Sequence, residues 1–246
     1  MTDLAILGVG LVAGLLVGLT SIGGVLVLPA LVILLGLSPH VAIPATMVSF
    51  IPAAAMVLAI VHRRGDLDLR AGASIWAGAV PGAFLGAAML PWISVSALLW
   101  AIAAMLAVSA VRAFARPPVP AGQARMPPAA ELGLLGLGVG VVSALTGTGG
   151  PVTLMPILGW RGVAPRQAVM LCQAITLPTV VFASLGYAYS LDLDWRLVGL
   201  LGSSMTLGVV SGMRAALHVQ LPVLARMIGA MMAGTAAIIA ARLILG

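Results

Sequence analysis

Long runs of this chain contain no charged residue, and this feature constrains the fold more than any other. Stretches free of Asp, Glu, Lys and Arg include Leu4–Leu37, Val41–Val61, and Ala71–Leu99 with its overlapping continuation Leu98–Val111. A run of about 18 or more apolar residues is long enough to cross a bilayer as a helix. Backbone N–H and C=O groups find no water partners in hydrocarbon, so such runs fold as helices. The sequence therefore predicts an all-α polytopic membrane protein.

The composition excludes soluble and nucleic-acid-binding classes. Of the 246 residues, 62% are hydrophobic and 7% are charged, which is too few to cover the surface of a soluble domain. The net charge is +6, but every basic residue is Arg, and these residues are scattered over loops and helix ends without a basic stripe. We expect an integral protein of a bacterial inner (plasma) membrane. Its expected partners are the bilayer and a small anionic substrate, a homodimer is compatible with the pattern, and no nucleic acid is expected.

The chain contains an internal repeat. A Pro-rich stretch, 116–128, cannot continue a helix and separates four apolar blocks from four more. When the sequence is shifted by 126 residues, the two halves align without a gap. Leu19-Thr20 meets Leu145-Thr146, Gly23-Gly24 meets Gly149-Gly150, and Asp66-Leu67-Asp68-x-Arg70 meets Asp192-Leu193-Asp194-x-Arg196. We predict a first membrane repeat at 1–115, a linker at 116–130 and a second membrane repeat at 131–246.

The first block of each half is broken in its middle. Half one reads Thr20-Ser-Ile-Gly-Gly24 and half two reads Thr146-Gly-Thr-Gly-Gly150, followed by Pro151. Paired Gly weakens a helix, and Pro fits the first turn of a new one. A break inside the membrane is tolerated where it lines a cavity, and the N–H groups of the new half-helix attract anions. The alternative is that these glycines only allow close helix packing.

The orientation of the halves depends on the path of this broken block. If the block crosses the membrane once, the halves are parallel and the twelve Arg divide 8 to 4 between the two sides. If it folds back, three spanning helices follow in each half, the halves are inverted, and Arg divides 10 to 2. The positive-inside rule favours the second arrangement. We therefore expect two inverted halves, each with a re-entrant first segment and three spanning helices.

Polar residues in the second block of each half are further candidates. Thr46 and Ser49 share a helix face, and so do Gln173 and Thr176, because each pair lies three residues apart. These residues line a pathway, or they bond to their own helix or hold helices together. The Asp of the Asp-x-Arg motif is expected to cap the helix that follows it. The expected anion-binding residues are Thr20, Ser21, Gly23, Gly24, Thr46, Ser49, Thr146, Thr148, Gly149, Gly150, Gln173 and Thr176.

At these residues the sequence resembles a known family. A Gly-rich turn, a Pro, a Pro-x-x-Ala segment, an Asp-x-Arg loop and Gly-rich helices, all duplicated, are similar to the sulfite exporter TauE/SafE family of membrane transporters. The resemblance covers nearly the whole chain. It implies transport of sulfur-containing anions such as sulfite, thiosulfate or organosulfonates. The family's first turn often carries three consecutive Gly, whereas Ile22 and Thr148 precede two Gly here.

We expect a secondary transporter for a small anion, of the sulfite, thiosulfate or sulfoacetate type, with alternating access at a midplane site between the repeats. The alternative is an anion or water channel that uses the same broken turns. All six acidic residues lie at block edges, so an intramembrane enzyme lacks a carboxylate to act as acid or base. We expect no enzyme activity, no cofactor and no metal site.

Overall fold

The computed structural model describes residues 2–20, 26–63, 68–115, 126–188, 193–215, 230, 233–234 and 236–241. In this part of the chain every element is a helix, as the sequence predicts. Five of the described helices are long and apolar enough to cross a membrane. The elements are α1 (Thr2–Thr20), α2 (Val27–Leu34), α3 (Pro39–Arg63), α4 (Leu69–Met89), the 3-10 turn η2 (Leu90–Trp92), α5 (Val95–Ala115), α6 (Ala129–Thr146), α7 (Pro151–Trp160), α8 (Pro165–Ala188) and α9 (Trp195–Ala215).

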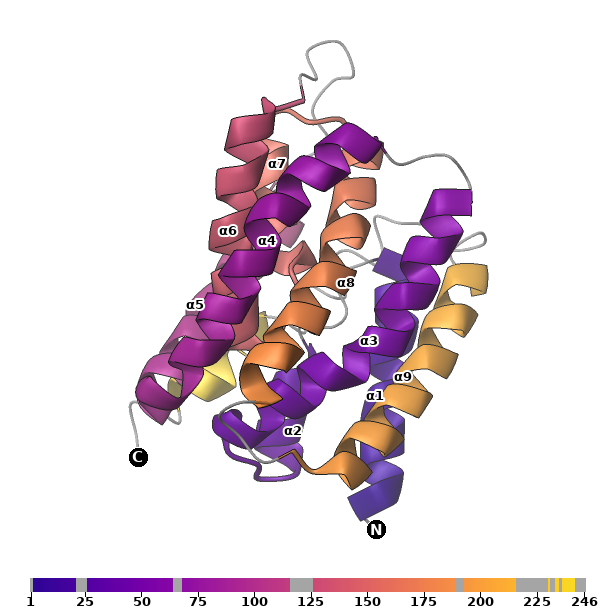
Figure 1. The fold of residues 1–246 in the computed structure, drawn as a ribbon. Helices are drawn as coiled ribbons and strands as arrows, with labels where there is room; N and C mark the ends of the chain where they lie inside the picture. Colours follow the sequence, from indigo (N-terminus) through magenta and orange to yellow (C-terminus); the bar gives the residue numbers. More distant parts are fainter. Residues whose placement is uncertain are drawn as a thin grey trace.

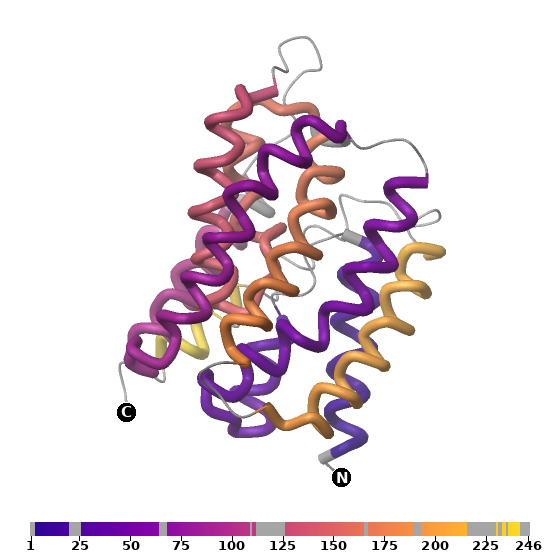
Figure 2. The backbone as a smooth tube through the Cα atoms, in the orientation of Figure 1, coloured from indigo at the N-terminus to yellow at the C-terminus, as the bar shows by residue number. Residues whose placement is uncertain are grey.

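Corresponding helices of the two halves start or end 126 residues apart. α3 and α8 begin at Pro39 and Pro165, and α1 and α6 end at Thr20 and Thr146. α1 and α3 run upward in Figure 1, whereas α6 and α8 run downward, and the tube in Figure 2 traces the same directions. Opposite directions are compatible with the predicted inverted halves, and the inverted arrangement stays a prediction. α6 begins at Ala129, so the last two residues of the expected linker are helical.

The second half folds back at its break. α6 descends to Thr146, and α7 returns beside it, so that Arg161 after α7 forms an ion pair of 2.8 Å with Glu131 in the first turn of α6. This contact is possible only if α7 runs antiparallel to α6. α6 has 18 residues, or about 27 Å at the rise of an α-helix. It is longer than the half-span expected from the break, and its length alone would allow a full crossing.

Glycine lets two helix pairs approach closely, and each pair joins one half to the other. α4 packs along α6, and α1 packs along α9, in the most extensive contacts of the described helices. A Cβ added at Gly82 of α4 would lie less than 3.0 Å from Leu137 of α6, and one added at Gly208 of α9 would lie equally near Leu11 of α1. Gly82 and Leu137 become Gly208 and Leu11 when the halves are exchanged by the 126-residue shift. The two close interfaces therefore lie at positions that the predicted repeat would make equivalent.

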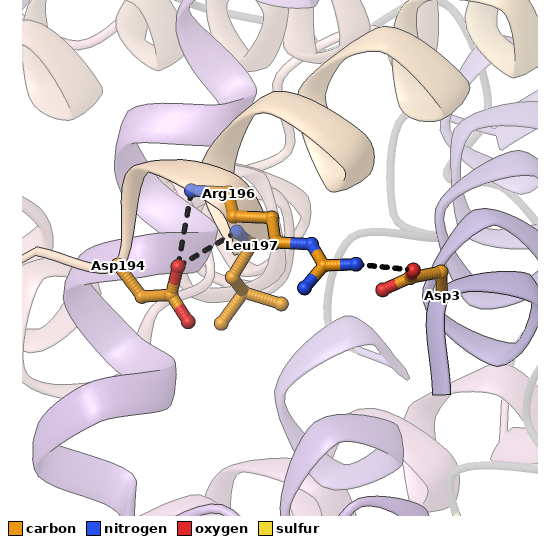
Figure 3. A network of polar contacts seen from close by, with 4 residues as sticks. All are labelled: Asp3, Asp194, Arg196 and Leu197. Carbon is orange, nitrogen blue, oxygen red and sulfur yellow. Dashed lines mark hydrogen bonds and ion pairs between the residues drawn. The ribbon is translucent and has the colours of Figure 1, made fainter. Parts of the chain in front are cut away.

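The Asp-x-Arg motifs cap helices, which confirms the structural interpretation of those residues. Asp68 accepts hydrogen bonds from the backbone N–H groups of Arg70 and Ala71, at 3.0 and 3.1 Å. Asp194 does the same for Arg196 and Leu197 at the start of α9 (Figure 3). The Arg196 guanidinium also donates to Asp3, with 2.6 Å between the nitrogen and oxygen, which joins the starts of α1 and α9. Asp66 and Asp192 lie outside the described residues.

A proline inside α8 frees a backbone carbonyl, which then accepts a hydrogen bond from another helix. Pro178 has no N–H, so the carbonyl of Ala174 loses the donor that a regular helix would supply. The indole N–H of Trp76 on α4 donates to this carbonyl instead, at 2.9 Å. α8 is thereby fixed against α4 at Ala174, which follows Gln173 directly and precedes Thr176 by two residues.

The arginine side chains that the structure describes are divided unevenly between the two ends of the bundle. Arg63, Arg70, Arg161 and Arg214 belong to the ends of α3, α4, α7 and α9 that point upward in Figure 1. Arg196 lies at the opposite end, beside the start of α1. By the positive-inside rule we expect the upper end to face the cytoplasm, and this orientation stays a prediction.

Candidate functional site

The site is built around the break between α6 and α7. Gly147 ends α6 in the left-handed conformation, with φ 67°, and its N–H donates to the carbonyl of Ser143. Gly149 has φ 72°, and Gly150, which precedes α7, has φ 110°. Such backbone angles strongly favour glycine, and Pro151 then occupies the first turn of α7 without needing a hydrogen bond. The Gly-Thr-Gly-Gly-Pro sequence is thus the chemical reason for a sharp, buried turn in mid-protein.

Hydroxyl groups gather on the α5 side of this turn. Thr146 Oγ1 donates to the carbonyl of Val142 at 2.7 Å and lies 3.1 Å from Thr148 Oγ1. The thioether sulfur of Met105, from α5, lies 3.7 Å from Thr146 Oγ1, 4.0 Å from Thr148 Oγ1 and 3.8 Å from Thr153 Oγ1. We call these three threonines and Met105 the hydroxyl cluster. It places three hydroxyl groups around one weak acceptor.

A small cavity borders the same turn. Its volume is about 20 Å³, which is room for one water molecule. The lining comes from both halves: Val17, Phe50, Ala53, Ala54 and Val57 of the first, and Thr148, Pro151, Gln173 and Thr176 of the second. The N-terminus of α7 therefore borders the cavity through Pro151. A helix N-terminus carries partial positive charge, and none of the lining residues has a charged side chain that would offset it.

Three residues of the sequence-predicted site meet at this cavity. Thr148, Gln173 and Thr176 line it, and the backbone at Gly149 lies next to Thr176, since a Cβ added at this glycine would be 3.4 Å from Thr176 Cγ2. The Thr176 hydroxyl donates to the carbonyl of Cys172 at 2.9 Å. Thr146 and Gly150 belong to the same turn. Thr146 is part of the hydroxyl cluster, and Gly150 directly precedes α7.

Other predicted residues lie elsewhere. Thr46 donates to the carbonyl of Ala42 at 2.7 Å, and Ser49 to the carbonyls of Ala45 and Val198 at 2.7 and 3.1 Å. Both side chains are buried, and neither lines the cavity. These contacts agree with the alternative interpretation from the sequence, in which the hydroxyl groups bond to their own helix or hold helices together. A role for Thr46 and Ser49 in anion binding stays a prediction.

The equivalent turn of the first half is outside the described residues. Ser21, Gly23 and Gly24 lie there, and the side chain of Thr20 is not described either. Val17, one turn before Thr20 on α1, lines the cavity, so the end of α1 reaches the same space as the second turn.

Sequence reasoning missed several residues of this region. Ser143 lies three residues before Thr146, and its hydroxyl is buried without a hydrogen-bond partner. A search for hydroxyl groups at helical spacing would have found it. Thr153 is the one hydroxyl residue of α7 and lies in its first turn, directly after the predicted Gly-Gly break, so its closeness to that break could have signalled it. Val17, Phe50 and Met105 are ordinary apolar residues in the sequence, and only tertiary packing brings them to the turn.

Comparison with known proteins adds one match. A family model described as Sulfite exporter TauE/SafE matches residues 6–240, nearly the whole chain. No match was found among curated proteins or among solved structures.

Proposed function

Because the chain belongs to the sulfite exporter TauE/SafE family, whose members are membrane transporters of sulfur-containing anions, we propose that it is a secondary transporter for a small sulfur oxyanion or organosulfonate. The proposed substrates are of the sulfite, thiosulfate or sulfoacetate type. The proposed mechanism is alternating access around a midplane site between two inverted halves.

The cavity beside the N-terminus of α7 is the observation that carries the proposal. An anion there would meet the helix N-terminus, the hydroxyl-bearing side chains of Thr148 and Thr176, and the amide of Gln173. Hydroxyl and amide groups donate hydrogen bonds to anionic oxygens, and the helix dipole favours negative charge. Any of the transported anions is larger than one water molecule, so its binding requires the lining to open. Opening and closing of a small enclosed space is the behaviour expected of a carrier.

The arrangement of the helices supports inverted halves. The cavity is lined from both halves, and the close interfaces α1–α9 and α4–α6 use equivalent residues. Because glycine brings the backbones of each pair into contact, we expect α1 with α9 and α4 with α6 to move as two rigid pairs, each of which contains one helix from either half. Rocking of one pair against the other, rather than of one half against the other, is the motion proposed to expose the cavity to either side.

The test measures binding and uptake of sulfite, thiosulfate and sulfoacetate by the purified protein in vesicles. Thr148→Val and Thr176→Val each remove one hydroxyl group at nearly constant volume. Loss of a hydrogen bond to a charged group costs about 1.5–3 kcal/mol, so each substitution should weaken binding by roughly tenfold or more. Uptake should fall in parallel.

Thr179→Val is the matched control on the same helix as Thr176. The Thr179 hydroxyl is buried and donates to the carbonyl of Ile175 at 2.8 Å, but Thr179 does not line the cavity. Its substitution should leave the affinity unchanged. Equal loss of affinity in Thr176→Val and Thr179→Val, or none in either cavity variant, would contradict the proposed site.

A carrier and a channel are separated by their kinetics. A carrier should show saturable uptake and counterflow, in which unlabelled anion inside the vesicles accelerates entry of labelled anion. A linear conductance without counterflow would instead favour the channel alternative.

A further inference from the structure

Met105 is the one residue of the hydroxyl cluster that lies on α5. Its sulfur has three hydroxyl oxygens within 4.0 Å, from the end of α6, from the turn and from the start of α7. A thioether is a weak hydrogen-bond acceptor. Three hydroxyl groups that converge on one weak acceptor are poised for a better acceptor, and an anionic oxygen is a much stronger one.

The hydroxyl groups are not fully engaged by other partners. Each has one proton, and Thr146 gives its proton to the carbonyl of Val142. Thr148 then has Thr146 Oγ1 and the Met105 sulfur as acceptors. For the Thr153 hydroxyl the structure gives the Met105 sulfur, at 3.8 Å. The Thr153 hydroxyl therefore gains a stronger bond when the sulfur is replaced by an anionic oxygen, and the Thr148 hydroxyl gains one when its proton turns from Thr146 to the anion.

Thr148 connects this cluster with the proposed anion cavity. Its side chain lines the cavity, while its hydroxyl faces Met105 and Thr146. A rotation about χ1 of Thr148 is enough to turn the hydroxyl from one space to the other. The cluster and the cavity are thus adjacent positions separated by one side chain.

α5 has space to move away from the cluster. Its contacts with α3, α6 and α7 are few compared with those of the paired helices. On its other side lies an apolar groove of about 480 Å³, whose lining includes Trp100, Ala104 and Ala107 of α5 and Ala236 of the last described segment. Displacement of α5 towards this groove carries Met105 away from the threonines.

We propose that Met105 forms the α5-side wall of the anion path, and that its thioether now occupies the position which an oxygen of the anion takes beside Thr148 and Thr153. This inference rests on the proposed function. It makes Met105 a specificity-determining residue, because the length of its side chain limits the size of the anion that fits against the hydroxyl cluster.

The first test places a cysteine in the path. Met105→Cys is treated with a negatively charged methanethiosulfonate reagent, in protein embedded in vesicles. A thiol on an aqueous anion path should react, and sulfoacetate, which does not itself react with the reagent, should slow the reaction by about tenfold when it fills the site. Val108→Cys lies one turn further on α5 at a half-exposed apolar position, where lipid should suppress the reaction. The parent protein gives the background, since its one cysteine, Cys172, is buried.

The second test measures substrate preference. Met105→Ala removes three heavy atoms beside the hydroxyl groups and should raise the ratio of bulky sulfonate uptake to sulfite uptake by at least about tenfold, since a single methylene in a pocket already changes discrimination on that scale. Met105→Leu keeps the volume and should keep the ratio. Met155→Ala removes a partly buried methionine from α7 and should also leave the ratio unchanged. A ratio is insensitive to how much of each variant is folded.

The outcomes separate this inference from the proposed function. If the parent transports sulfur anions but Met105→Cys reacts no faster than Val108→Cys, the inference about Met105 is wrong. If Met105→Cys reacts with the anionic reagent but no sulfur anion protects it and none is transported, Met105 lines an anion path and the proposed substrate class is wrong. An unchanged preference in Met105→Ala would overturn the specificity role.

Discussion

Gly82→Ala should destabilise the protein because α4 and α6 have no room for a methyl group between them. A Cβ at this position would lie less than 3.0 Å from the carbonyl oxygen and the Cα of Leu137. Both atoms belong to backbone, so the contact cannot be relieved by a side-chain rotation. The two helices must separate, and overpacking of this kind costs about 1–3 kcal/mol. That cost corresponds to roughly a 5- to 150-fold change in the equilibrium between folded and unfolded protein.

Gly138→Ala on α6 is the matched control. Nothing lies within 4 Å of a Cβ added there. Ala favours a helix over Gly by up to about 1 kcal/mol, so this variant should be as stable as the parent or more so. Gly208→Ala, at the equivalent place between α9 and α1, should be destabilised as much as Gly82→Ala, because its Cβ would meet Leu11 in the same way.

The assay is unfolding in mixed micelles, where the mole fraction of a denaturing detergent is raised and tryptophan fluorescence is followed. We expect the midpoint to fall in Gly82→Ala and Gly208→Ala and to stay or rise in Gly138→Ala. Similar midpoints in all three variants would refute the reasoning, since helix propensity would then outweigh the close packing of the pairs.

Three further predictions concern the caps, the turn and the orientation. Asp194→Ala removes the cap of α9 and should cost about 1 kcal/mol in the same unfolding assay, whereas Asp194→Asn, which keeps an acceptor, should cost less. Tyr187→Phe removes the hydroxyl that donates to the carbonyl of Ala144 near the end of α6. The substitution should cost about 1–3 kcal/mol of stability, because that buried carbonyl then lacks this hydrogen-bond donor. An unchanged unfolding midpoint would mean that another group replaces the donor. A cysteine at Gln123 should resist a membrane-impermeant label in intact cells, because the Arg residues that flank the linker favour a cytoplasmic position. A reporter fused to the C-terminus should be found outside the cytoplasm. Labelling of Gln123→Cys from outside, or a cytoplasmic reporter, would contradict this orientation.

The sequence alone determined the class of the protein, two helix caps and the turn that ends α6, whereas the start of α6 lies two residues inside the expected linker. Runs without charge can only be membrane helices, because hydrocarbon offers the backbone no other partner. Asp68 and Asp194 are predictable caps because a cap is local: the side chain bonds N–H groups two and three residues further on. The turn after Thr146 is predictable for the same reason, since Gly149 and Gly150 tolerate backbone angles that other residues avoid.

The tertiary structure decided which helices meet, and therefore what surrounds the turn. In an apolar sequence almost every helix face could pack against another, and lipid tails are as apolar as leucine, so hydrophobicity does not choose the partners. Which helices pair depends on how closely their backbones fit. The close approach of Gly82 to Leu137 can be recognised only in the three-dimensional structure. The same packing brings Val17 to the cavity and Met105 to the threonines, and it leaves Thr46 bonded to its own helix. No local pattern encodes these contacts, because each joins residues far apart in the chain or depends on which face its helix turns inward.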